Sequence, residues 1–173
     1  MWIIFIIACA ICLLDQATKL YVELSLKTTS HVDIIDGFLY LTKSYNTGAG
    51  WSIMNDNTLL LALISLVATI ALIYFTIKRF KTFKGHVLPG ICMALALGGC
   101  VGNMVDRFMT VFGVRDGVID FVGMYIGSYS WPIYNVADIS LVLGIVLFAI
   151  WALFFDRSNK SENNVVEDEK KDA

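Results

Sequence analysis

Charged residues are scarce in this chain. Only 16% of its 173 residues are Asp, Glu, Lys or Arg, whereas 57% are hydrophobic, and the mean hydropathy is +0.70. A soluble domain of this length could not bury so much apolar surface, so lipid must cover part of it. The net charge of -2 provides no basic surface either, which argues against nucleic acid as a partner.

Residues that hold metals or disulfides are also few. The four cysteines all lie in apolar stretches: Cys9, Cys12, Cys92 and Cys100. Cysteine in such a setting acts as a small hydrophobe, so we expect core packing and no disulfide framework, although Cys9 and Cys12 have C-x-x-C spacing. The two histidines, His31 and His86, fall on opposite sides of the membrane in the topology given below. We therefore expect no metal site and no cofactor.

Four stretches are predicted to cross the membrane: about 1–22, 58–77, 87–107 and 137–155. The first is free of charge only to Leu14, and it reaches membrane length only if its helix continues through Asp15 and Lys19. A cleaved signal peptide is the alternative for this stretch. It lacks a basic n-region, however, and the apolar run before Ala8 is too short for that alternative.

Basic residues set the predicted orientation. Lys78, Arg79, Lys81 and Lys84 crowd the short link between the second and third spans, which predicts that this link is cytoplasmic. With an even number of spans, both termini are then cytoplasmic as well. Residues 1–155 are expected to form one membrane domain. The polar tail, 156–173, is expected to be disordered.

Two long loops, about 21–57 and 108–134, then face outward, and loops of such length usually carry function. Val32–Tyr45 and Gly117–Tyr125 are rich in β-branched and aromatic residues interrupted by glycine, which predicts short strands. The predicted fold class is therefore an all-α membrane protein, with four transmembrane helices and a small extracytoplasmic β-sheet and loop region.

Ionisable groups in the spans are informative, because each costs about 2.5 to 3.5 kcal/mol at a helix centre. Asp15 and Lys19 are four residues apart and share one helical face. We expect this pair to anchor the helix end or to pack against other buried polar groups. Contact with a substrate is the alternative interpretation.

A second polar group follows small residues near the outer end of the third span. Gly98, Gly99 and Gly102 would let neighbouring helices approach closely, and Asn103, Asp106 and Arg107 come next. Asp106 and Arg107 are expected to pair with each other. The alternative interpretation is that the whole segment only holds helices together.

Two further acids reach the outer interface. Asp120 follows Ile119 in the second outer loop, and Asp138 lies where the fourth span begins, after the interfacial aromatic residues Tyr129, Trp131 and Tyr134. Singly, each acid has an ordinary interpretation, as an exposed turn residue or as an acid favoured by the helix dipole. Together, beside Asn103, Arg107 and Asn135, they predict a chemical site.

Two carboxylates a few ångströms apart share a proton and titrate as a pair. The ionised member can take a proton from a water that attacks a peptide carbonyl, while the protonated member donates to the developing oxyanion. This is the chemistry of an aspartic protease. A histidine-activated serine or cysteine nucleophile is disfavoured, since only His31 is expected on the outer side.

The chain resembles the bacterial lipoprotein signal peptidases, also called signal peptidase II. The resemblance covers nearly the whole chain except the tail, and five motifs in order carry it: Asp15-Gln16-Ala17-Thr18-Lys19, Asn46-Thr47-Gly48-Ala49, Gly98 to Arg107, Val118 to Phe121 and Asn135 to Asp138. It implies an aspartic endopeptidase that removes the signal peptide of prolipoproteins on the N-terminal side of a diacylglyceryl-modified cysteine.

The resemblance also implies roles for residues. Asp120 and Asp138 would be the catalytic dyad, with a second group binding substrate or supporting the dyad: Asn46, Asn103, Arg107, Asn135, Asp15, Lys19, Asp106 and Gly99. The expected partners are lipidated prolipoproteins and membrane lipid. We expect a monomer in the bacterial cell membrane with its active site on the extracytoplasmic face.

Two other classes of protein remain as alternatives. A small transporter would spread its charges through the membrane depth, whereas these gather at one end, and no inverted repeat is visible. A structural helper protein would not need the two acids. Among membrane aspartic proteases, the presenilin and prepilin-peptidase type is set aside because its Gly-x-Gly-Asp motif is absent.

Overall fold

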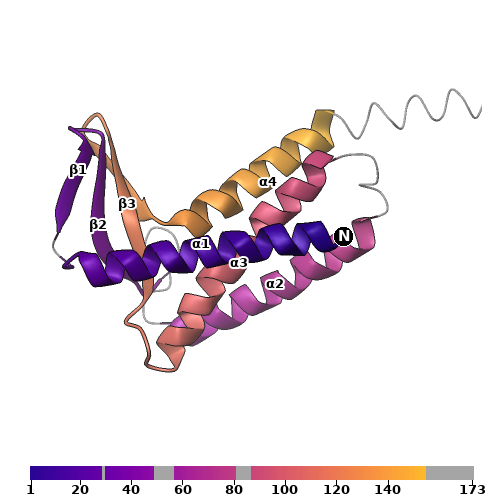
Figure 1. Ribbon diagram of the computed structural model, residues 1–173, viewed down its shortest axis with the longest axis horizontal. Coiled ribbons are helices and arrows are strands. Elements are labelled where there is room, and N and C mark those ends of the chain that lie inside the picture. Colours follow the sequence, from indigo (N-terminus) through magenta and orange to yellow (C-terminus); the bar gives the residue numbers. More distant parts are fainter. Residues whose placement is uncertain (29, 49–56, 81–86, 155–173) are drawn as a thin grey trace, which may run out of the picture.

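The computed structural model describes residues 1–28, 30–48, 57–80 and 87–154. Its elements follow one another as α1 (Trp2–Ser25), β1 (His31–Ile35), β2 (Leu39–Asn46), α2 (Thr58–Arg79), α3 (Val87–Val111), β3 (Val118–Ile126), β4 (Tyr129–Tyr134) and α4 (Val136–Phe154). The helices run along the length of the molecule, and the strands gather at one end of them (Figure 1). The N-terminus lies at the opposite end.

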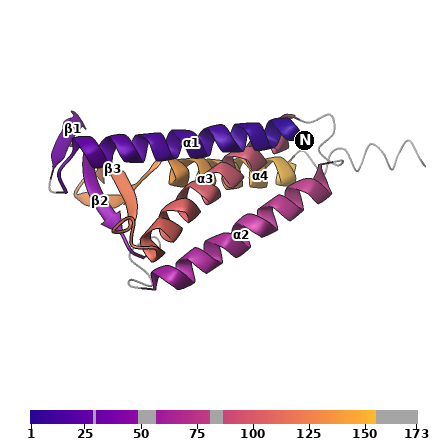
Figure 2. The ribbon, with the colours of Figure 1, turned by 60° about the horizontal axis from the view of Figure 1, so that its bottom comes forward.

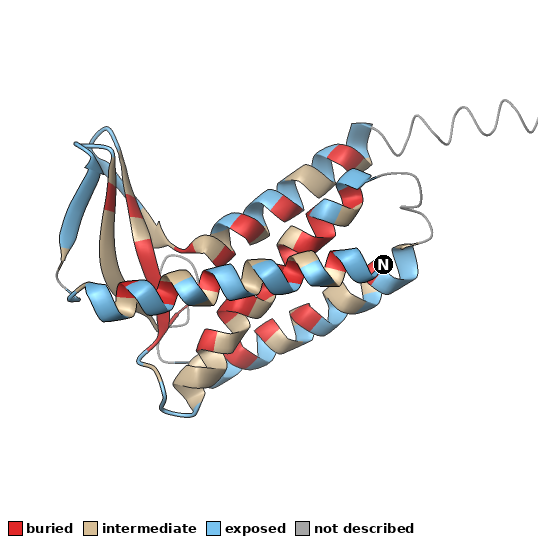
Figure 3. Ribbon diagram, viewed as in Figure 1, coloured by how far each residue is buried: buried red, intermediate tan, exposed pale blue. Residues whose placement is uncertain are grey.

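In the described part of the chain, four helices are long and apolar enough to cross a membrane. Buried and exposed residues alternate along α1, α2 and α4, as the colours of the ribbon show (Figure 3). Many of the exposed residues on these three helices are large and apolar. Val67 of α2 and Leu13 of α1 are examples, with exposed fractions of 66% and 64%. Exposed apolar surface on this scale fits contact with lipid.

Helix α3 packs against all three other helices and is the most buried of them. Small residues make this possible. A Cβ at Gly99 would collide with the carbonyl oxygen of Ala137 in α4, and one at Gly144 would lie 2.6 Å from the amide nitrogen of Ala96. The close approach predicted for the glycines of α3 is therefore confirmed. In a second view, α2 diverges from α1, and α3 lies between them (Figure 2).

The strands form one antiparallel sheet in the order β1-β2-β3-β4. Strands β2 and β3 come from the two long loops, so their pairing brings both loops to the same end of the helices. Ile119 and Phe121 of β3 pack with Val22 near the end of α1 and fix the sheet to the bundle. Strand β4 was not predicted as a strand, because its aromatic residues were interpreted as an interfacial belt.

Four helices with a small antiparallel sheet confirm the predicted fold class. The tail from 156 onward lies outside the described residues, as do Ala49 of the second motif and Lys81, Lys84 and His86 of the basic link. The single domain over 1–155 stays a prediction.

Candidate active site

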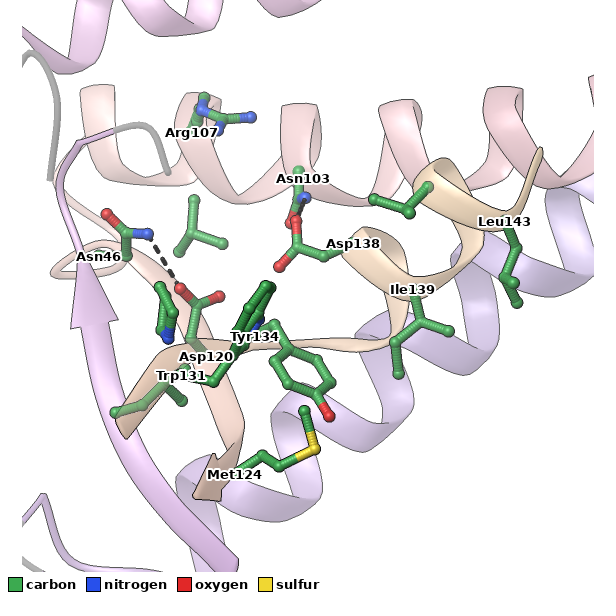
Figure 4. Close-up of a pocket in the computed structure, with 14 residues that line it drawn as sticks. Asn46, Asn103, Arg107, Asp120, Met124, Trp131, Tyr134, Asp138, Ile139 and Leu143 are labelled. Atoms are coloured by element: carbon green, nitrogen blue, oxygen red, sulfur yellow. Dashed lines mark hydrogen bonds between the residues drawn. The ribbon is translucent and has the colours of Figure 1, made fainter. Parts of the chain in front are cut away.

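A cavity of about 520 Å³ lies where the sheet meets α3 and α4 (Figure 4). Its lining comes from β2, α3, β3, β4 and α4: Asn46, Asn103, Arg107, Val118, Asp120, Met124, Trp131, Pro132, Ile133, Tyr134, Asp138, Ile139, Val142 and Leu143. The two acids singled out from the sequence both line it. The structure thus brings together residues that are distant in the chain.

Asp120 comes from the third residue of β3, opposite Ser44 of β2. It is only 4% exposed. Its two carboxylate oxygens each accept a hydrogen bond: Oδ2 from the Asn46 side-chain amide at 2.9 Å and Oδ1 from that of Asn135 at 2.6 Å. Asp120 is therefore a buried acid, and two amides hold its carboxyl group from different elements.

The surroundings of Asp120 favour its protonated form. Burial raises the pKa of Asp120 to about 7, and the neighbouring charge of Asp138 acts in the same direction. Hydrogen bonds from Asn46 and Asn135, with the more distant charge of Lys19, lower the pKa and limit this shift. An acid with such a pKa can keep or release its proton near neutral pH, which suits a proton-transferring role.

Asp138 lies in the first turn of α4. Its Oδ1 accepts a hydrogen bond from the side-chain amide of Asn103 at 2.7 Å, and its Oδ2 accepts one from the backbone N–H of Asn135 at 3.1 Å. In Figure 4 its carboxylate faces the same space as that of Asp120. One acid is thus presented by the sheet and the other by a helix.

Asn135 and Asn103 connect the two acids. The side-chain amide nitrogen of Asn135 donates to Asp120. It also donates to Oδ1 of Asn103, at 3.1 Å. The amide nitrogen of Asn103 donates to Asp138. Asp120, Asn135 and Asn103 are buried, and hydrogen bonds link them to Asp138. The protein thus holds the two carboxyl groups in a defined relative placement.

Behind the two asparagines lies a buried ionic cluster. Lys19 is fully buried, and its Nζ lies 2.8 Å from Asp15, 2.6 Å from Asp106 and 3.0 Å from Oδ1 of Asn103. Asp15 in turn accepts a hydrogen bond from the backbone N–H of Ala137 at 2.9 Å. The interpretation of Asp15 and Lys19 as a pair that packs against other buried polar groups is confirmed.

The predicted pairing of Asp106 with Arg107 is wrong. Consecutive residues on a helix do not face each other, and the two side chains diverge. Asp106 pairs with Lys19, whereas Nη1 of Arg107 donates to the hydroxyl of Ser65 in α2 at 3.1 Å. Arg107 also lines the cavity, and its buried Nε finds no hydrogen-bond acceptor among the described residues.

Sequence reasoning missed Gln16 and Arg115. The side-chain amide of Gln16 donates to Asp106 at 3.1 Å, and Arg115 forms an ion pair with the same acid. Gln16 gave no signal beyond its place in a motif. Arg115 gave one, because it is the single basic residue of the predicted outer loop 108–134, where the positive-inside rule disfavours Lys and Arg.

Much of the cavity lining is apolar, including Met124, Trp131, Ile133, Val142 and Leu143. Val142 and Leu143 of α4 are 58% and 47% exposed. The apolar lining is thus continuous with the lipid-facing surface of a helix. Within the described ranges, no three His, Cys, Asp or Glu side chains are grouped as metal ligands.

The model of the family described as Signal peptidase (SPase) II matches residues 7–154. This chain belongs to the signal peptidase II family. Among its relatives is a lipoprotein signal peptidase of Geobacillus kaustophilus (strain HTA426), 38% identical over 154 residues, which are 89% of this chain and 95% of the relative. Another, from Bacillus velezensis (strain DSM 23117), is 37% identical, with 91% and 97% of the two chains covered.

Solved structures agree with this membership in signal peptidase II. Two structures described as a bacterial membrane enzyme superpose on the chain with TM-scores of 0.79 and 0.76, at 32% and 31% identity. The first covers 92% of each chain, and the second covers 90% of this chain and 95% of its own.

As a signal peptidase II, the protein is an aspartic peptidase that removes signal peptides from prolipoproteins, and it is a multi-pass membrane protein. The sequence-based prediction of activity is therefore confirmed. The transporter and the structural helper no longer stand as alternatives.

Proposed function

We propose that Asp120 and Asp138 are the catalytic dyad and that they cut the precursor on the N-terminal side of a diacylglyceryl-modified cysteine. One observation carries the assignment: both carboxyl groups line the same cavity, linked through Asn135 and Asn103. An aspartic peptidase needs two such acids beside one reacting bond.

The raised pKa of Asp120 supports placing the proton on this member of the pair. Ionised Asp138 takes a proton from the attacking water as the water oxygen bonds to the scissile carbonyl carbon, and Asp120 gives its proton to the carbonyl oxygen. When the resulting tetrahedral intermediate collapses, the C–N bond breaks. Asp138 then returns its proton to the leaving amine, and a hydroxyl of the intermediate returns one to Asp120.

Other residues serve this reaction indirectly. Asn46, Asn103 and Asn135 orient the two carboxyl groups through the hydrogen bonds described above. Arg107 lines the cavity, and its guanidinium would donate to a backbone carbonyl of the bound peptide. The remaining residues support the framework from behind or beside the cavity: Asp15, Lys19, Asp106 and Gly99.

The apolar side chains that line the cavity support a lipid-bearing substrate. Each buried CH₂ of an acyl chain contributes about 0.8 kcal/mol, so the diacyl chain can hold the modified cysteine beside Val142 and Leu143 while the peptide crosses the acids. Membrane lipid would surround the same helix face. Nothing in this arrangement requires a second subunit, and we propose that a monomer acts.

The orientation proposed for the membrane rests on charge. Lys78 and Arg79 end α2 at the opposite end of the bundle from the sheet, near the N-terminus (Figure 1). The positive-inside rule places that end in the cytoplasm. Both termini would then be cytoplasmic, and the acids would lie at the extracytoplasmic surface of a bacterial cell membrane.

The test compares Asp120→Asn and Asp138→Asn with Asp33→Asn, a matched control on the exposed strand β1. Each purified variant is incubated with a lipidated precursor, and the masses of the products are measured by mass spectrometry. We expect both dyad variants to lose at least about 1,000-fold in kcat and the control to match the unchanged enzyme. Normal cleavage by either dyad variant would overturn the assignment, and a product whose first residue is not the lipidated cysteine would overturn the cleavage site.

A further inference from the structure

Arg115 lies between α3 and β3, in a segment that is otherwise exposed. Its neighbours Val114 and Asp116 face outward, yet the Arg115 side chain is only 8% exposed. An arginine in a surface loop usually keeps its charged head in water. Here the guanidinium turns inward, away from solvent, and it does not line the cavity.

The inward-facing guanidinium joins two helices. Nη1 forms an ion pair with Oδ1 of Asp106 on α3, and Nη2 lies 3.3 Å from Oε2 of Glu23 on α1. Nη1 is also within 3.5 Å of the side-chain oxygen of Gln16 on α1. A planar guanidinium presents several donors in fixed directions, whereas the lysine ammonium is a point charge on a flexible stem.

Arg115 also completes the charge of the buried cluster. Asp15, Lys19 and Asp106 are all fully buried and contain two carboxylates but only one ammonium group. Arg115 supplies the second cation, directly against Asp106. With Arg115 in place, Lys19 can also donate to Asn103, which carries the hydrogen bond to Asp138.

Packing and hydrogen-bond contacts connect Arg115 to both Asp120 and Asp138. In one direction, Gly117 packs so closely on β2 that a Cβ there would lie 3.1 Å from the backbone nitrogen of Asn46. The next residue, Val118, pairs with Asn46 in the sheet. Asp120 follows two residues later. In the other direction, Asp106, Lys19 and Asp15 lead to the backbone N–H of Ala137, the residue before Asp138.

We propose that Arg115 is a positioning residue, which fixes the start of β3 on α1 and α3 and so sets the placement of Asp120 relative to Asp138. This inference rests on the proposed dyad. Arg115 contacts neither Asp120 nor Asp138 and does not line the cavity, so it acts through Asp106, Gly117 and the residues they contact.

The experiment compares Arg115→Ala and Arg115→Lys with Asp116→Asn, the adjacent and exposed matched control. For Arg115→Ala we expect kcat to fall about 10-fold to 100-fold, because small misplacements of reacting groups are costly, with KM changed less than about twofold. Arg115→Lys keeps the positive charge but lacks the planar fork, so its kcat should lie between that of Arg115→Ala and that of the unchanged enzyme. Added guanidinium ion should raise kcat of Arg115→Ala but not of Asp116→Asn.

Unchanged kcat in Arg115→Ala would overturn the inference, as would a raised KM with normal kcat, since that pattern indicates substrate binding. Should Arg115→Ala not fold, Arg115→Lys decides, and a kcat equal to that of the unchanged enzyme overturns the inference. Failure of the dyad itself is separate: it would appear as activity in Asp120→Asn or Asp138→Asn, whatever the Arg115 variants do.

Discussion

Asn135 and Asp138 cap the first turn of α4 reciprocally. The side-chain oxygen of Asn135 accepts from the backbone N–H of Asp138 at 3.0 Å, and the Asp138 carboxylate accepts from the backbone N–H of Asn135 at 3.1 Å. This is the geometry of a capping box. The Asn135 amide also donates to Asp120, so one residue caps a helix and orients the opposite acid.

Replacing Asn135 can separate these two roles. Asn135→Ala removes both the cap, at a cost of about 1 kcal/mol, and the donor to Asp120. Asn135→Ser retains a capping oxygen but lacks the amide donor. We expect both variants to lose about 10-fold or more in kcat, since the acid is no longer held. Thermal unfolding in detergent should show a lower Tm for Asn135→Ala only. Full activity in Asn135→Ser would contradict the role in orienting Asp120.

The pH dependence of cleavage should report Asp120. Because its pKa is raised to about 7 and the reaction needs its proton, kcat/KM should fall as the pH rises through this value. Asn46 donates to the charged form of Asp120, so Asn46→Ala should raise the pKa further and move the descending limb to higher pH. Profiles measured on a lipidated peptide check this. A limb that stays in place in Asn46→Ala would show that another group causes it.

Lys19 should be needed for stability as well as for activity. Lys19→Met leaves Asp15 and Asp106 buried without their shared cation, and breaking a buried pair in this way costs about 3 to 5 kcal/mol. Thermal unfolding should show a clearly lower Tm, whereas the exposed Lys27→Met serves as the control and should not change it. Adding Asp15→Asn to Lys19→Met should recover part of the loss. Equal Tm values for the two single variants would refute the argument.

Gly99 should be intolerant of even one methyl group. A Cβ at Gly99 would collide with the Ala137 carbonyl, so Gly99→Ala must push α4 away from α3 at the residue before Asp138. The matched control is Gly90→Ala on the same helix, where the nearest atom would be 3.6 Å away, on Ile4. We expect Gly99→Ala to lower both Tm and kcat and Gly90→Ala to alter neither. Normal cleavage by Gly99→Ala would show that α4 can shift without disturbing the acid.

Much of this fold follows directly from the sequence. Long uncharged runs predict spans because each backbone polar group in lipid must be satisfied within a helix. Asp15 and Lys19 could be paired in advance, since residues four apart share a helical face. The two acids could be chosen because charges beside a membrane span are costly.

Contacts that depend on the path of a loop could not be predicted. Arg115 reaches Asp106 through the path of the segment between α3 and β3. Gly113, with a φ of 70°, marks the end of α3, but it does not predict where the next residues lie. Strand β4 was missed for a different reason: its aromatic residues were interpreted as an interfacial belt. They lie on an edge strand of the sheet, where Pro132, which cannot donate to a ladder, is tolerated. Asp106 and Arg107 were paired wrongly because adjacency in sequence was taken for adjacency in space.

The two acids are contributed by a strand and by the last helix of the bundle, and this has a consequence for biosynthesis. A chain emerging from the ribosome delivers Asp120 first and lacks Asp138 until its final span is made. On the proposed dyad, a partly inserted chain is therefore not yet a protease. Proteolytic competence arises only when the last span has joined the others, so unfinished molecules cannot cut neighbouring proteins during their own assembly.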